Sequence, residues 1–255
     1  KNHLKLTSLD LRNNPIGPTS CQQISEYLKL PQVQLKSLKL NQGNISDAGC
    51  TYLSQALEVN ESLQKLFIAS NNIEEKGSIS LFQALSLNKT LDTLVLDNND
   101  ISKSGIELAT MISKNTAIKR LSIARCGIVG SSALCDAISK NDTLDKLNIA
   151  ENKHLHPEKM LEFISTNETL SCLNLQSCSM DDRGIKTLVN SLHHNQSLTL
   201  LDISDNKITD IGGQRLLTLL SQPKCTIRSL SLRSNFQITQ ELRDELRQLE
   251  IMVEL

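Results

Sequence analysis

Aromatic residues are scarce in this sequence. They make up 2% of its 255 residues, and tryptophan is absent. Proteins that bind single-stranded nucleic acid stack the bases on aromatic side chains, so this composition argues against nucleic acid as a partner. A core without large rings has to be built from leucine and isoleucine, which suits a narrow layer that repeats.

Strong net charge and long hydrophobic runs are missing as well. The formal net charge is −1, so no bulk field draws the chain toward nucleic acid or an anionic membrane. No run of about 18 apolar residues occurs, so we expect no membrane-spanning helix and no membrane partner. The chain does not open on a signal-peptide pattern.

Catalytic and cofactor-binding motifs are also absent. The sequence contains neither G-x-x-x-x-G-K-[S/T] nor G-x-G-x-x-G. His154 and His156 are spaced to share one side of the chain, but no cysteine cluster nearby completes a metal site. Cys172 is expected at an outward strand position without a histidine in its unit, which indicates a plain surface thiol. The sequence therefore predicts no enzyme, no metal or other cofactor, and no small-molecule substrate.

The cysteines are odd in number and form no C-x-x-C pair. Most occupy places where a small or apolar residue is expected. They are Cys21, Cys50, Cys126, Cys135, Cys172, Cys178 and Cys225. This scattered distribution predicts reduced, buried thiols in a cytoplasmic protein.

What the sequence does contain is a nine-fold recurrence of Leu-x-x-Leu-x-Leu. The units start at Leu6, Leu35, Leu63, Leu91, Ile118, Leu144, Leu170, Leu198 and Ile227. Successive starts are 26 to 29 residues apart. A period in this range, with one short strand per unit, is typical of a leucine-rich solenoid.

Each unit begins with a strand that ends in a bend. In the fourth unit, alternation points Leu94 and Leu96 inward, and Asn99 follows where the backbone turns away. A buried asparagine there can bond the unpaired backbone groups, so we expect a ladder of such residues. The ladder positions hold Asn14, Asn71, Asn99, Asn152, Asn206 and Asn235, with Cys126, Cys178 and Gly43 in three other units.

The second half of each unit has helical spacing, and glycine recurs near its start. The positions are Gly49, Gly77, Gly105, Gly184 and Gly212. Glycine costs about 1 kcal/mol in a helix interior. We therefore expect each of these glycines to let the neighbouring helix approach closely.

Asn-x-[Ser/Thr] triplets precede several strands. They begin at Asn60, Asn88, Asn141, Asn167 and Asn195. Such triplets can accept N-linked glycans. Their spacing follows the repeat, however, and Asn115 fills the one gap, so we favour a turn in which the asparagine side chain bonds nearby backbone.

The complete pattern is L-x-x-L-x-L-x-x-[N/C]-x-I-x-x-x-G-x-x-x-L-x-x-A-L, with N-x-T-L between units. It resembles the ribonuclease-inhibitor-like class of leucine-rich repeats over nearly the whole chain. The resemblance implies an α/β horseshoe with a parallel sheet on the concave face and helices on the convex face. It implies little about function, because the class includes inhibitors, sensor regions of NOD-like receptors, GTPase activators and scaffold subunits.

We expect residues 1–255 to form a single solenoid of about nine repeats. Residues 239–255 are expected to form a C-terminal amphipathic helix and an incomplete last strand. The sixth unit lacks the helix glycine, which predicts a shorter or irregular convex segment. The first strand has no cap over Leu6, Leu9 and Leu11, so we expect the chain to be part of a longer protein.

Strand residues between the inward leucines are expected to face the concave side. Their mid-strand series is Asp10, Lys39, Phe67, Val95, Ser122, Asn148, Asn174, Asp202 and Ser231. Phe67 and Val95 are apolar neighbours in this series, and aromatic anchors often carry binding energy. The alternative is that Phe67 only covers neighbouring strands.

Around this pair the sequence places small and basic residues. They are Lys39, Lys65, Arg120, Arg125, Ala69 and Ala124. We predict that these residues, with Phe67 and Val95, bind an acidic or mixed protein partner on the concave face. The predicted function is a non-catalytic scaffold or adaptor module of an intracellular protein. The alternatives are a regulator of a small GTPase and the ligand-sensing region of an NOD-like receptor.

Overall fold

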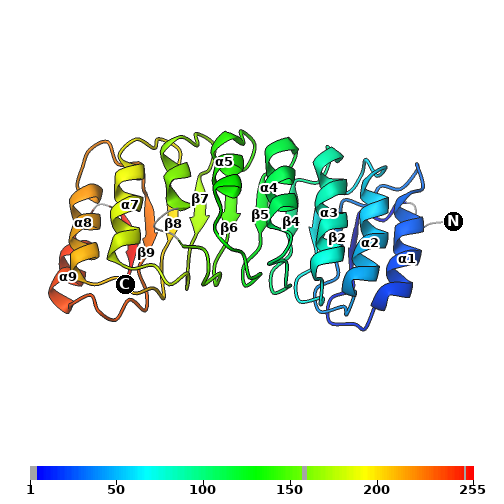
Figure 1. The fold of residues 1–255 in the computed structure, drawn as a ribbon, viewed down its shortest axis with the longest axis horizontal. Coiled ribbons are helices and arrows are strands. Elements are labelled where there is room, and N and C mark those ends of the chain that lie inside the picture. Colours follow the sequence, from blue (N-terminus) through cyan, green and yellow to red (C-terminus); the bar gives the residue numbers. More distant parts are fainter. Residues whose placement is uncertain (1–4, 157–159, 250) are drawn as a thin grey trace. The chain divides into compact units, whose positions relative to one another are not determined.

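The computed structural model describes residues 5–156, 160–249 and 251–255. By its internal contacts the chain divides into two compact units, residues 1–127 (unit 1) and 128–255 (unit 2). In each unit, short strands alternate with helices along the chain (Figure 1). This is the architecture of a leucine-rich-repeat solenoid, as the repeat predicted.

The described residues of unit 1 form five strands of three residues each. They are β1 (Ser8–Asp10), β2 (Ser37–Lys39), β3 (Lys65–Phe67), β4 (Thr93–Val95) and β5 (Arg120–Ser122). Four helices follow the first four strands: α1 (Gly17–Leu28), α2 (Ser46–Leu57), α3 (Glu75–Leu87) and α4 (Gly105–Lys114).

Unit 2 contains a second run of three-residue strands. They are β6 (Lys146–Asn148), β7 (Cys172–Asn174), β8 (Leu200–Asp202), β9 (Ser229–Ser231) and β10 (Met252–Glu254). Its helices are α5 (Ser132–Lys140), α7 (Asp182–Leu192), α8 (Asp210–Leu220) and α9 (Gln240–Arg247), with the 3₁₀ helix η2 (Leu161–Ser165) between β6 and β7.

Consecutive strands pair in parallel within each unit, and the helices cover one face of them. The central residue of each strand, a leucine in β1 to β9 and Val253 in β10, points toward the helices. Leu38, Leu66 and Leu94 are at most 1% exposed. The other two residues of each strand point to the opposite side, which we call the open face.

The asparagine ladder is present and satisfies backbone groups at the bend. Asn99 donates from Nδ2 to the carbonyl oxygens of Ile68 (3.1 Å) and Leu96 (2.7 Å). Its Oδ1 accepts the N–H groups of Asn71 (2.9 Å) and Ile73 (3.0 Å). One side chain therefore connects two successive repeats.

Cysteine fills the ladder place and keeps the donor role. The Cys126 Sγ lies 3.4 Å from the carbonyl oxygen of Leu96 and 3.3 Å from that of Ala124. The Ile101 N–H, which an asparagine would bind through its side chain, donates instead to the backbone oxygen of Cys126 at 3.1 Å. A backbone carbonyl thus takes over one of the acceptor contacts.

The Asn-x-[Ser/Thr] triplets form turns, as favoured from their spacing. The Asn60 Oδ1 accepts the N–H groups of Ser62 (3.0 Å) and Leu63 (2.7 Å), and its Nδ2 donates to the Leu28 oxygen at 2.8 Å. The nitrogen that would carry a glycan is buried and already bonded. Asn88, Asn115, Asn167 and Asn195 make the corresponding bonds.

The expectation for the helix glycines is correct at some positions and wrong at two. A Cβ on Gly77 would lie 2.6 Å from Asp47 Oδ1 in the preceding helix, and one on Gly212 would lie 2.5 Å from Asp182 Oδ1. At Gly105, by contrast, nothing lies within 4 Å, and the three atoms nearest to a Cβ on Gly184 all belong to Met180, just ahead of its own helix. Sequence spacing alone does not distinguish these cases, because the contact depends on the neighbouring repeat.

The sixth repeat departs from the others. Residues 157–159 of this repeat lie outside the described part of the chain, and the five residues Leu161–Ser165 form the 3₁₀ helix η2. The 3₁₀ geometry agrees with the irregular convex segment expected for this unit.

Candidate functional site

The open face of unit 1 brings the predicted apolar pair together. The strand register aligns Lys39 with Phe67, Phe67 with Val95, and Val95 with Ser122. Phe67 and Val95 are half-buried. The Lys39 ammonium lies 5.8 Å from the centre of the Phe67 ring, within cation–π range.

A second row on the same face carries basic residues. Lys65 is aligned with Thr93, and Thr93 with Arg120. Lys65 and Arg120 are exposed, whereas Thr93 is buried. Two strand spacings of about 4.8 Å separate the two cations, and their row runs beside the row that contains Phe67 and Val95.

The two predicted alanines lie where each strand leaves the sheet. Ala69 and Ala124 are half-buried, and both donate their backbone N–H to side chains of the preceding repeat. The acceptors are Asn41 Oδ1 at 2.9 Å and Asp97 Oδ1 at 2.8 Å. Arg125 follows in the turn after β5, exposed and with a φ of 51°.

Carboxylates on this face are engaged by their neighbours. Asp97 also accepts the Ser122 hydroxyl at 2.6 Å. Asp10 accepts two hydrogen bonds from the Arg12 guanidinium, which hold the pKa of that carboxyl below its usual value. Lys39 lies 3.8 Å from the same carboxylate. Both carboxylates are therefore bonded to neighbouring side chains, while Lys65 and Arg120 are exposed.

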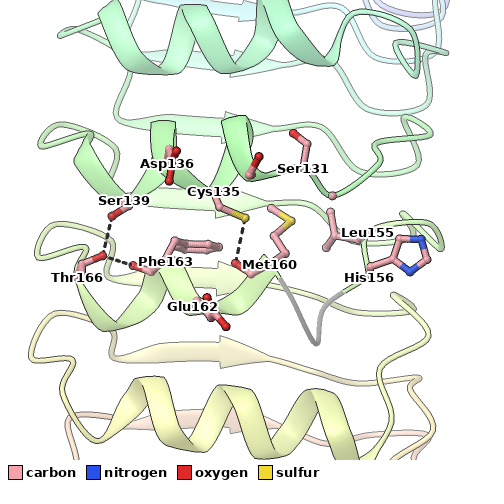
Figure 2. A pocket seen from close by; sticks show the side chains of 12 residues that line it. Ser131, Cys135, Asp136, Ser139, Leu155, His156, Met160, Glu162, Phe163 and Thr166 are labelled. Atoms are coloured by element: carbon pink, nitrogen blue, oxygen red, sulfur yellow. Dashed lines mark hydrogen bonds between the residues drawn. The ribbon is translucent and has the colours of Figure 1, made fainter.

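A separate cavity opens in unit 2 between α5 and η2 (Figure 2). Its volume is about 480 Å³. Two bonds bridge it, from Cys135 Sγ to the Met160 oxygen (3.4 Å) and between the hydroxyls of Ser139 and Thr166 (2.6 Å). The apolar side chains of its lining are at most 2% exposed: Leu155, Met160 and Phe163. A ligand there would gain little from apolar burial.

Known proteins with similar sequences indicate the family of this chain. A leucine-rich-repeat family model matches residues 2–25, 166–189 and 194–217. The sequence is 32% identical over 236 residues, 90% of this chain, to NACHT, LRR and PYD domains-containing protein 14 of Mus musculus. It is 27% identical over 249 residues, 96% of this chain, to ribonuclease inhibitor of Sus scrofa. The chain belongs to the ribonuclease-inhibitor-like leucine-rich-repeat family.

The chain spans only part of these repeat proteins, 21% of the NACHT protein and 49% of the inhibitor. A solved structure titled crystal structure of Rad7 and Elc1 complex in yeast has the same fold, with a TM-score of 0.62 and 19% identity. The alignment covers 88% of this chain and 55% of that one. The relatives support a protein-interaction repeat module.

The leucine-rich repeats of unit 2 carry open-face residues that the sequence analysis missed. Leu200 is aligned with Cys172 on one side and with Ser229 on the other, and Ser229 with Met252. Leu200 is 40% exposed and Met252 64%. The signal that identifies them is the outward position at the first residue of each strand, two residues before the series that contains Phe67 and Asp202.

Most thiols of the repeats are shielded. Cys21, Cys50, Cys126 and Cys178 are buried, and burial raises the pKa of Cys50 and Cys126 to about 12. Cys172 is half-buried, and burial raises its pKa as well. The four buried thiols contribute packing rather than chemistry.

Two further features concern metals and membranes. His154 and His156 are both exposed, and the described residues contain no group of three His, Cys, Asp or Glu side chains placed to hold a metal ion. Among the helices of those same residues, none has both the length and the apolar character needed to cross a bilayer.

Proposed function

We propose that the protein is a non-catalytic interaction module, a scaffold or adaptor, and that unit 1 binds its partner through the open face. The observation that carries the proposal is the half-buried Phe67–Val95 pair beside the row that holds the exposed cations Lys65 and Arg120. Interface anchors are commonly aromatic, and surrounding polar groups set the specificity.

We expect the partner to present an apolar side chain that is surrounded by acidic residues. Exposed Lys36 and Lys119 add to the basic character of this face, while Asp97 is occupied by Ser122 and Ala124. Five strands at roughly 4.8 Å spacing span roughly 20 Å. That width fits one helix or loop of a partner protein rather than a whole globular domain.

Affinity capture with the wild type and with Phe67→Glu and Val95→Glu tests the proposal. We expect the substitutions to remove partners at an unchanged melting temperature, because the side chains are only half-buried. Loss of one anchor commonly costs about 2 kcal/mol, or roughly 30-fold in affinity. Phe236→Glu, at an 85% exposed site in unit 2, is the matched control. Retention of every partner by both open-face variants would refute the proposal.

A second candidate is the repeat region of a NACHT-containing receptor. The 32% identity with a mouse protein named for its NACHT, LRR and PYD domains supports it. The complete coding sequence decides this point, since a NACHT domain in the same polypeptide is required. Regulation of a small GTPase has no support among the relatives named above. Measurement of GTP hydrolysis over a panel of small GTPases tests it, and absence of stimulation would dismiss it.

We propose a cytoplasmic location. All seven cysteines are free thiols, which suits a reducing compartment, and the buried asparagine turns leave no need to invoke glycans. Fractionation of cells that express the tagged protein checks this, and recovery from the secretory pathway would contradict it.

A further inference from the structure

Three exposed aliphatic side chains lie at the ends of the first three helices of unit 1. Each follows a buried helix leucine by two residues. The three pairs are Leu28 and Leu30, Leu57 and Val59, and Leu85 and Leu87. Leu30 is 42% exposed, Val59 63% and Leu87 72%. We call Leu30, Val59 and Leu87 the helix-end stripe.

The repeat itself does not require an aliphatic residue at this place. The equivalent positions of the next five repeats are polar: Lys114, Lys140, Thr166, His194 and Gln222. Packing within the described residues does not explain the stripe either, because its members are exposed. Exposed apolar side chains that are confined to three successive repeats indicate a surface that another molecule covers.

The turns that carry the stripe are bonded to one another, and a groove lies along part of it. Asn60 Nδ2 donates to the Leu28 oxygen at 2.8 Å, and Asn88 Nδ2 donates to the Leu57 oxygen at 2.8 Å, so successive turns stack directly. A groove of about 490 Å³ lies between the ends of α1 and α2, with Leu30 and Val59 in its lining.

Charge around the stripe is mainly negative. Glu58 and Glu61 are exposed beside Val59, and no ion pair to either carboxylate is found in the parts of the chain that the structure describes. Lys29 is paired with Glu26 at 2.8 Å, and the Lys89 ammonium lies 3.4 Å from the Thr116 hydroxyl. The C-termini of α1, α2 and α3 add about half a negative charge each.

The spacing of the stripe matches a partner helix. Neighbouring helices α1, α2 and α3 lie side by side (Figure 1), and packed helices are about 8–10 Å apart. Seven residues of an α-helix rise about 10.5 Å. A helix laid along the stripe thus meets Leu30, Val59 and Leu87 with apolar residues at seven-residue intervals.

We propose that the helix-end stripe of unit 1 docks an amphipathic α-helix of a partner protein, with apolar residues at heptad spacing flanked by lysine or arginine. This surface is distinct from the open face. Its three residues lie at helix ends, whereas the open face is formed by strands.

Binding of a synthetic peptide tests the docking site. The probe is a fluorescent, capped peptide of about 22 residues with leucine at i, i+3 and i+7 positions and lysine on either side of them. We expect the anisotropy titration to show saturable binding. The double variant Val59→Gln and Leu87→Gln should weaken it by at least about tenfold, while its melting temperature stays unchanged, since Gln222 occupies the same place in a later repeat.

Further variants separate the apolar contribution to peptide binding from the electrostatic one. Ile106→Gln removes an aliphatic side chain that is 76% exposed at the other end of a helix, and it should leave binding unchanged. The double variant Glu58→Gln and Glu61→Gln should weaken binding severalfold at low salt and less at high salt. Phe67→Glu on the open face should not alter the titration.

Several results would overturn the docking site. They are absence of binding to the wild type, equal binding by the stripe variant, and equal binding of a peptide with glutamate in place of lysine. A sedimentation profile in which the wild type is a dimer and the stripe variant a monomer would also overturn it, because a second copy would then cover the stripe.

Discussion

Replacement of Asn99 by alanine provides a quantitative test of the ladder. The substitution removes the acceptor for the N–H groups of Asn71 and Ile73 and the donor for the carbonyl oxygens of Ile68 and Leu96. A buried polar group that loses its partner costs about 1–3 kcal/mol. Two amides alone therefore cost about 2–6 kcal/mol, and we expect a loss of about 4 kcal/mol in the free energy of unfolding.

Two matched variants sharpen this test. Asn99→Cys keeps a donor of the kind that Cys126 provides in the next repeat, so we expect it to lose about half as much as alanine does. Asn14→Ala removes the equivalent side chain in the first repeat, where it is exposed and bonds the oxygens of Leu11 and Arg12. Water can replace those bonds, so its loss should stay below about 1 kcal/mol.

Urea denaturation gives the change in free energy, and hydrogen exchange gives its location. Repeat proteins lose cooperativity when a single interface weakens, so the local probe is essential. In Asn99→Ala the amides of Asn71 and Ile73 should exchange faster than those of distant repeats. Equal losses for Asn14→Ala and Asn99→Ala, or unchanged exchange at these two amides, would refute the reasoning.

Three further predictions concern glycine, a helix cap and the thiols. Gly77→Ala should destabilise the protein because its Cβ would meet Asp47 at 2.6 Å. Gly105→Ala has nothing within 4 Å of its Cβ, so it should be neutral or stabilise the protein by up to about 1 kcal/mol. Thermal unfolding compares the two variants. Burial raises the pKa of Asp181, but the Gly184 N–H and the Arg183 groups bonded to its carboxylate leave the pKa below its ordinary value of 3.8. Asp181→Ala should therefore cost about 1 kcal/mol at neutral pH, with the difference shrinking as pH falls through that lowered pKa. Iodoacetamide should modify the three half-buried cysteines of the native protein and spare the four buried ones; mass spectrometry counts the adducts, and modification of Cys50 without unfolding would contradict the burial.

The strand register was predictable because the repeat length and the alternation of side chains leave little freedom. A slip of one residue would turn every inward leucine to the open face. Lys39, Phe67 and Val95 therefore had to fall in one row, and the structure places them there. The asparagine turns were predictable for a related reason, since their bonds run mainly to groups two or three residues away.

Contacts between repeats were less accessible to sequence reasoning. Gly77 and Gly105 occupy the same place in the pattern, yet only the former meets a neighbour. The assignment of Lys65 and Arg120 to one row needed Thr93 between them, and Leu200 was overlooked beside Cys172. Each of these contacts and alignments depends on side chains that lie roughly one repeat away along the chain.

The sequence by itself determined the repeat, the direction of each side chain from its strand and the residues that close each turn, because those properties are local and recur with every unit. Only the tertiary structure decided how far Phe67 and Val95 are buried, which glycines touch a neighbouring helix and that Leu30, Val59 and Leu87 remain exposed together. Burial and exposure are sums over neighbours from other repeats, and those neighbours are defined by how the layers stack.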